Sequence, residues 1–127
     1  MTQTLLAFDF GTRRVGVACG NTLMRQAQPL RSIAAEGDAR FAQIKKLIAE
    51  WQPDALVVGV PFHPDGAAHA VTEQARRFAR QLHGRFQLQV HEVDERYSSV
   101  EAERDDPDDL DAASAAVILQ QFFNENP

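Results

Sequence analysis

The chain has 127 residues, of which 44% are hydrophobic and 24% charged, a composition typical of one globular domain with a single core. Its only cysteine, Cys19, excludes an internal disulfide and any zinc site built from several thiolates. No apolar run reaches the length of a membrane span, and the first residues lack the pattern of a signal peptide. We therefore expect one cytoplasmic domain over residues 1–127, without a membrane partner.

The predicted elements begin with a strand over 4–10, an apolar run broken by Asp9 that is typical of a central strand buried on both faces. The turn Gly11-Thr12-Arg13 leads into a second strand over 14–20, in which small residues alternate with larger apolar ones. A third strand is expected around 27–33. These three segments predict an antiparallel meander at the start of the chain.

The rest of the chain alternates between helical and strand patterns. A helix capped by Asp38 is expected to reach Trp51, and a helix over 70–83 is expected to stop at Gly84. The remaining predicted elements are strands over 55–60 and 86–93 and helices over 98–104 and 109–123. The order βββαβαβαα predicts an α/β fold with a five-stranded mixed sheet flanked by helices.

Asp9 and Glu95 are the first two candidate site residues. A carboxylate among the apolar neighbours of Asp9 is costly unless something compensates its charge. A metal ion would compensate it directly, and backbone N–H groups of the Gly11-Thr12 turn are the alternative. Glu95 follows the last predicted strand, and strand ends in such sheets converge on one crevice, so the two carboxylates are expected to meet there. A surface ion pair with Arg96 would explain Glu95 alone, and Asp94 is a candidate supporting residue.

Asp111 is the third candidate. It belongs to a group of five aspartates: Asp105, Asp106, Asp108, Asp109 and Asp111. On helical spacing Asp111 aligns with Ala115 and Ile118, on the apolar stripe that must face the sheet, whereas Asp109 aligns with a more polar face. Of the five, Asp111 is the one predicted to point inward.

Three carboxylates without a Cys or His cluster suit Mg²⁺ or Mn²⁺ rather than zinc. Two such ions about 3.5–4 Å apart can activate a water and stabilise the leaving oxygen during phosphodiester hydrolysis. The four histidines of the chain lack metal-ligand spacing among themselves. Asp9, Glu95 and Asp111 are therefore predicted to be both metal ligands and catalytic residues.

Two basic segments are candidates for phosphate contact. The turn Gly11-Thr12-Arg13-Arg14 could bring backbone N–H groups and two guanidinium groups to a phosphate, although a tight hairpin with exposed arginines is the simpler alternative. Arg76, Arg77 and Arg80 form a basic helix face of a kind that is more often solvated. Residues 1–91 hold 11 Lys and Arg against 7 Asp and Glu, a net +4, whereas residues 92–127 hold 2 against 11, a net −9. This asymmetry fits a phosphate-binding surface beside a metal site, and equally a solvated acidic end.

Four segments in order resemble the motifs of the YqgF (RuvX) family of RNase H-like proteins, relatives of Holliday junction resolvases: AFDFGTRRVGVA, VVGVPFHPDG, VDERYSSVEA and LDAASAAVIL. The resemblance implies an RNase H-like nuclease acting in maturation of the 5′ end of pre-16S ribosomal RNA. It also implies catalytic acids at Asp9, Glu95 and Asp111. The chain departs from the family pattern before its last helix, where the connection ERDDPDD is shorter and more acidic than usual.

Alternatives to this interpretation remain. The same chemistry could act on branched DNA, although an RNA precursor is the favoured partner. The segment DFGTRRVGVA also fits a phosphate motif of the actin and sugar-kinase superfamily, whose members close two lobes around ATP, and this chain can supply only one lobe. A non-catalytic RNA- or protein-binding module is the remaining alternative, favoured by the short acidic connection and opposed by the three acids. The sequence leaves the oligomeric state open.

Overall fold

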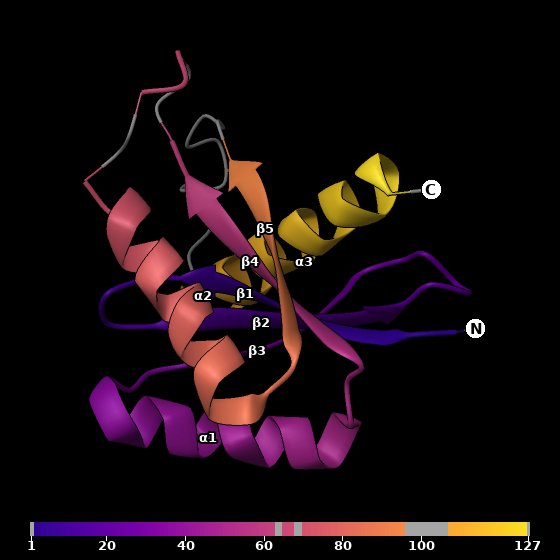
Figure 1. The fold of residues 1–127 in the computed structure, drawn as a ribbon, viewed down its shortest axis with the longest axis horizontal. Helices are drawn as coiled ribbons and strands as arrows, with labels where there is room; N and C mark the ends of the chain where they lie inside the picture. Colours follow the sequence, from indigo (N-terminus) through magenta and orange to yellow (C-terminus); the bar gives the residue numbers. More distant parts are fainter. Residues whose placement is uncertain (1, 63–64, 68–69, 96–106, 127) are drawn as a thin grey trace.

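The computed structural model describes residues 2–62, 65–67, 70–95 and 107–126 (Figure 1). The strands are β1 (Thr4–Phe10), β2 (Val15–Asn21), β3 (Gln28–Ile33), β4 (Ala55–Pro61) and β5 (Gln89–Glu95). The helices are α1 (Gly37–Trp51), α2 (Thr72–Phe86) and α3 (Pro107–Glu125). The predicted order of elements is confirmed over these residues, and the helix expected over 98–104 lies outside them. Within the described residues, no helix is both long and apolar enough to cross a lipid bilayer.

The five strands form one mixed sheet in the order β3-β2-β1-β4-β5. The hairpin-connected strands β1, β2 and β3 pair antiparallel, whereas β4 and β5 follow β1 in parallel after crossovers through α1 and α2. The predicted five-stranded α/β architecture is confirmed. Its central strand is β1, which explains why the β1 sequence is almost continuously apolar.

Helices cover both faces of the sheet, with α1 and α2 on one side and α3 on the other (Figure 1). Because side chains alternate along a strand, Leu6 and Phe8 pack into the core under α1 and α2, whereas Leu5 and Ala7 pack under α3. Asp9 continues the second set. Its carboxylate therefore belongs to the face that α3 covers.

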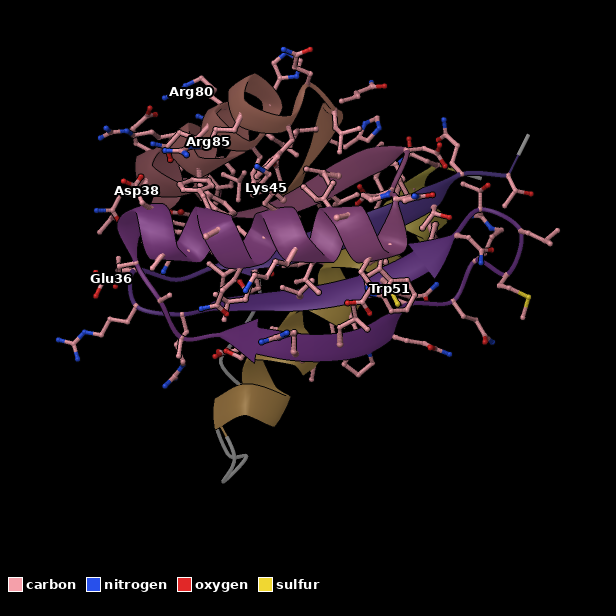
Figure 2. All side chains as sticks on the ribbon, turned by 90° about the horizontal axis from the view of Figure 1, so that it is seen from below. Glu36, Asp38, Lys45, Trp51, Arg80 and Arg85 are labelled. Atoms are coloured by element: carbon pink, nitrogen blue, oxygen red, sulfur yellow. The ribbon has the colours of Figure 1, made fainter. Side chains whose placement is uncertain are left out.

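The helix ends differ from the prediction. The residue that caps α1 is Glu36 rather than Asp38, so the cap lies two residues earlier than predicted. The helix begins at Gly37, at φ 58°, and the Glu36 side chain makes no capping hydrogen bond. Figure 2 shows α1 lying along the sheet, with Asp38 and Trp51 at opposite ends. Helix α2 runs through Gly84 and ends at Phe86, so β5 begins later than predicted and includes Glu95 as its last residue.

Candidate active site

A row of residues across the sheet, at the level of Asp9, forms the floor of the candidate site. Asp9 lies opposite Gly16 of β2 and Gly59 of β4, and Gly16 lies opposite Ser32 of β3. Neither glycine has a side chain, so these two strands place no side chain of their own beside the Asp9 carboxylate. The strand register therefore isolates one acid at the centre of the α3 face.

The main chain of Asp111 occupies the space above Gly16, and the side chains of Ile118 and Glu95 occupy the space above Gly59. A Cβ atom at Gly16 would lie 1.9 Å from the carbonyl oxygen of Asp111, and one at Gly59 would lie 2.6 Å from Oε2 of Glu95. Helix α3 thus crosses directly over Gly16, and the Glu95 carboxylate, in a side chain only 7% exposed, lies over Gly59. The structure brings Asp9, Glu95 and Asp111 together on one face, where the sequence analysis expected them to meet.

The Asp9 carboxylate is electrostatically uncompensated. Burial, and secondly the nearby charge of Asp111, raises the pKa of Asp9 to about 7. In the described part of the chain, its carboxylate takes part in no ion pair and accepts no side-chain or backbone hydrogen bond. The alternative role, acceptance of N–H bonds from the Gly11-Thr12 turn, finds no such bond among these residues. Asp9 is thus a half-buried acid with a negative neighbour.

Asp111 has two partners instead. Its Oδ2 atom accepts a hydrogen bond of 2.8 Å from Nε of Arg14 and one of 2.9 Å from Oγ of Ser32. These bonds hold the carboxylate toward β2 and β3. Among the described residues, no three His, Cys, Asp or Glu side chains are grouped closely enough to hold a metal ion. The three acids therefore share a face without forming a closed metal site in this conformation.

The turn predicted to bind phosphate is tight and is held by a hydrogen bond from α1. A Cβ atom at Gly11 would lie 2.5 Å from the carbonyl oxygen of Arg14, so only glycine fits there. Arg40 of α1, only 5% exposed, donates from Nη2 to the carbonyl oxygen of Thr12 at 3.2 Å and from Nε to that of Ala35 at 2.8 Å. Sequence reasoning missed Arg40, although its place four residues before Ile44 on the apolar stripe was a usable signal.

Arg40 also carries a charge into an apolar environment. Its guanidinium lies 5.4 Å from the centre of the Phe10 ring, and burial lowers the pKa of Arg40 from its ordinary value. The buried Arg40 guanidinium donates to the carbonyl oxygens of Thr12 and Ala35. Breaking either bond would leave a buried polar group without a partner, so Arg40 restrains both segments. The Gly11–Arg14 turn is thereby fixed to the start of α1.

The other candidate residues are placed less favourably. On α2, Arg80 pairs with Glu73 at 2.8 Å and Arg76 with Glu92 at 3.6 Å, so acids offset much of this basic face, part of which is visible in Figure 2. Asp94 is exposed, and strand alternation turns its side chain to the face opposite Glu95. The side chains of Asp109 and Arg96 lie outside the described residues.

The fold places the chain in a known structural class. Its structure superposes on that of Thermus thermophilus RuvC in complex with a Holliday junction substrate with a TM-score of 0.59, at 12% identity, over 97% of this chain and 94% of that one. It also superposes on Archaeoglobus fulgidus Pelota with a TM-score of 0.53, at 8% identity, over 97% of this chain and 34% of that one. The first of these neighbours has an RNase H-like fold, and this chain shares it.

The family is equally clear. The model of the family described as RuvX, Holliday junction resolvase, matches residues 3–125, and the chain belongs to this family. A protein of Albidiferax ferrireducens named "Putative pre-16S rRNA nuclease" is 64% identical over 95% of this chain and 78% of its own length. A protein of the same name from Polaromonas is 60% identical over 98% of this chain and 91% of its own length.

Proposed function

We propose that this chain is a single-domain, divalent-metal-dependent nuclease that hydrolyses a phosphodiester bond of pre-16S ribosomal RNA during maturation of its 5′ end. The observation that carries the proposal is the gathering of Glu95 and Asp111 over the two glycines beside Asp9. The relatives' name supports the choice of RNA, because they are more than half identical over nearly the whole chain.

The residues of the site fit a divalent cation in chemistry. Carboxylate oxygens are the ligands that Mg²⁺ and Mn²⁺ prefer. Asp9 is a half-buried acid whose pKa is raised to about 7 by desolvation first and by the charge of Asp111 second. We infer that Asp9, Glu95 and Asp111 would hold the metal. Bound there, it would supply an activated water and stabilise the leaving oxygen. Asp111 would complete the site by directing its free oxygen inward.

The chain's own residues position the substrate in this proposal. Backbone N–H groups of Gly11 and Thr12 and the exposed guanidinium of Arg13 would bind a phosphate beside Asp9. Arg14 would join them when it is released from Asp111, and Arg40 would keep the turn in place. Burial of the acids between the sheet and α3 would limit the access of bulk water to the reacting phosphate.

Cleavage assays with single carboxylate variants test the proposal. An RNA carrying the 5′ precursor segment of 16S RNA is incubated with the protein in Mn²⁺, Mg²⁺ or EDTA. We expect cleavage only with metal, and a loss of at least a hundredfold in D9N, E95Q and D111N, because each removes one charged ligand and keeps the shape. D38N is the matched control, since Asp38 is fully exposed on α1, which covers the opposite face of the sheet from α3. Metal-independent cleavage, or equal loss in D38N, would overturn the proposal.

Branched DNA is the second candidate substrate. The family description names a Holliday junction resolvase, and the superposed RuvC structure holds a Holliday junction. A four-way DNA junction therefore belongs in the same assay. Faster cleavage of the junction than of the precursor RNA would identify branched DNA as the substrate. The proposed role of the three acids would be unchanged.

A further inference from the structure

Ser32 stands at the end of the row that contains the acids. The register places it beside Gly16, which in turn lies beside Asp9. Since α3 crosses over Gly16 so closely that a Cβ atom would lie 1.9 Å from the carbonyl oxygen of Asp111, the Ser32 hydroxyl reaches the Asp111 side chain from the neighbouring strand. Its hydrogen bond to Asp111 joins residues 79 positions apart in the sequence.

The two donors to Asp111 differ in kind. Arg14 is a long, charged side chain that is 43% exposed, and an ion pair of this kind is weakly held because water and salt compete for both partners. Ser32 is short, neutral, half-buried and fixed to a paired strand, so little rotamer freedom is lost when its hydroxyl bonds the carboxylate. Both bonds reach the same oxygen, Oδ2.

This arrangement leaves Oδ1 of Asp111 out of both bonds. A carboxylate anchored through one oxygen has its other oxygen fixed in direction, which is how outer hydrogen bonds orient metal ligands in proteins. A cation between Asp9 and Asp111 would also relieve the repulsion that helps raise the pKa of Asp9. Arg14 would be displaced by that cation, whereas Ser32 has no charge and can stay.

We propose that Ser32 is a positioning residue that anchors Asp111 through Oδ2 and so presents Oδ1 to the divalent cation. The inference rests on the proposed function, since it assigns a role toward the same metal. Ser32 touches neither substrate nor metal. Its effect is exerted entirely through Asp111.

Binding of Mn²⁺ to the whole protein, measured by calorimetry without RNA, tests this role. We expect S32A to raise the Mn²⁺ dissociation constant by about tenfold, in line with the loss of other outer-shell hydrogen bonds to metal ligands. S32T keeps a hydroxyl on a strand-compatible side chain and should restore most of the affinity. T22A is the matched control and should bind Mn²⁺ like the wild type. It removes a hydroxyl that accepts a hydrogen bond from the backbone N–H of Gln3, at the end of β2 opposite to Gly16.

The outcomes separate this inference from the proposed function. If the wild type binds Mn²⁺ with D111N impaired, and S32A binds as tightly as the wild type, the positioning role of Ser32 is wrong and the metal site stands. If neither the wild type nor D111N binds Mn²⁺, the proposed function itself fails. Thermal unfolding in EDTA should be nearly equal for S32A and S32T, and a large loss in S32A alone would make the residue structural.

Discussion

Asp9 couples the ionisation of the site to the stability of the fold. Its pKa is raised to about 7 in the folded chain, from 3.8 as the ordinary value, by burial first and by Asp111 second. Folding therefore favours the protonated acid. The stability that Asp9 contributes is complete below about pH 4 and is lost as the pH rises through about 7. At 1.36 kcal/mol per pKa unit, the loss in the metal-free protein is on the order of 4 kcal/mol.

Urea unfolding in EDTA at pH 5 and pH 8 measures this effect. We expect the wild type to lose more stability between the two pH values than D9N, because asparagine cannot ionise. The pKa of His91 is lowered by burial and works in the opposite direction, but it is common to both proteins and cancels in the comparison. Saturating Mn²⁺ should restore wild-type stability at pH 8. A D9N protein much less stable than the wild type at pH 8 in EDTA would mean that Asp9 is structural.

At the scale of the elements, the close crossing of β2 and α3 is what brings Asp111 to the site. In G16A the added Cβ would meet backbone rather than a flexible side chain, so α3 has to shift away from the sheet. We expect a loss of about 1–3 kcal/mol of stability, as for other overpacked cores. Mn²⁺ binding should weaken as well, because Asp111 moves with its helix.

The matched control is G84A, which has open space around its added Cβ within α2. Alanine is the better helix former, so G84A should gain about 0.5–1 kcal/mol and bind Mn²⁺ normally. Chemical denaturation of both variants and the wild type measures whether each substitution lowers or raises the free energy of unfolding. Equal stability of G16A and the wild type would contradict the close crossing of β2 and α3.

Helices and strands were predictable where the pattern of neighbouring residues determines them. Apolar runs and helical stripes gave the order of strands and helices, and the phase of α3 gave Asp111 its inward direction. The end of α2 was wrong because the cost of Gly84 within a helix, about 0.5–1 kcal/mol relative to alanine, is too small to end it there. The helix continues to Phe86 and ends at Gln87, which takes the left-handed conformation. The cap at Asp38 was wrong because Gly37 starts α1 in a backbone conformation that only the structure reveals.

The placement of the acids on one face of the sheet was predictable, whereas the residues that contact them were not. Asp9 and Asp111 stand out because a charge on an apolar strand or stripe needs an explanation. Ser32, by contrast, is an ordinary strand residue, and its role depends on the register that sets it beside Gly16. The ion pair between Arg14 and Asp111 spans 97 positions and likewise depends on how α3 packs. Contacts of this range follow from the assembled sheet rather than from any sequence pattern.

At the scale of the whole molecule, the proposed function would give Arg14 two negative partners in turn, Asp111 and a substrate phosphate. In EDTA, Arg14 should stay in its ion pair with Asp111. A divalent cation would neutralise Asp111 and free the guanidinium for RNA. Metal binding and strand binding should therefore reinforce each other through one side chain, and this coupling can be read from salt dependence.

Fluorescence anisotropy with a single-stranded RNA measures that dependence in Ca²⁺, which supports binding without turnover, and in EDTA. Removing one cationic partner of an RNA phosphate should flatten the plot of log affinity against log salt by about 0.7. R13Q should flatten it by about that amount in both conditions, because Arg13 is exposed and pairs with no acid among the described residues. R14Q should do so only in Ca²⁺, and the double variant should reduce the slope there by on the order of one to one and a half. R77Q, on the outer face of α2, is the comparison, because the other arginines of α2 are paired with Glu92, Glu73 and Asp38. An unchanged slope in the double variant with a reduced slope in R77Q would move the phosphate site to α2.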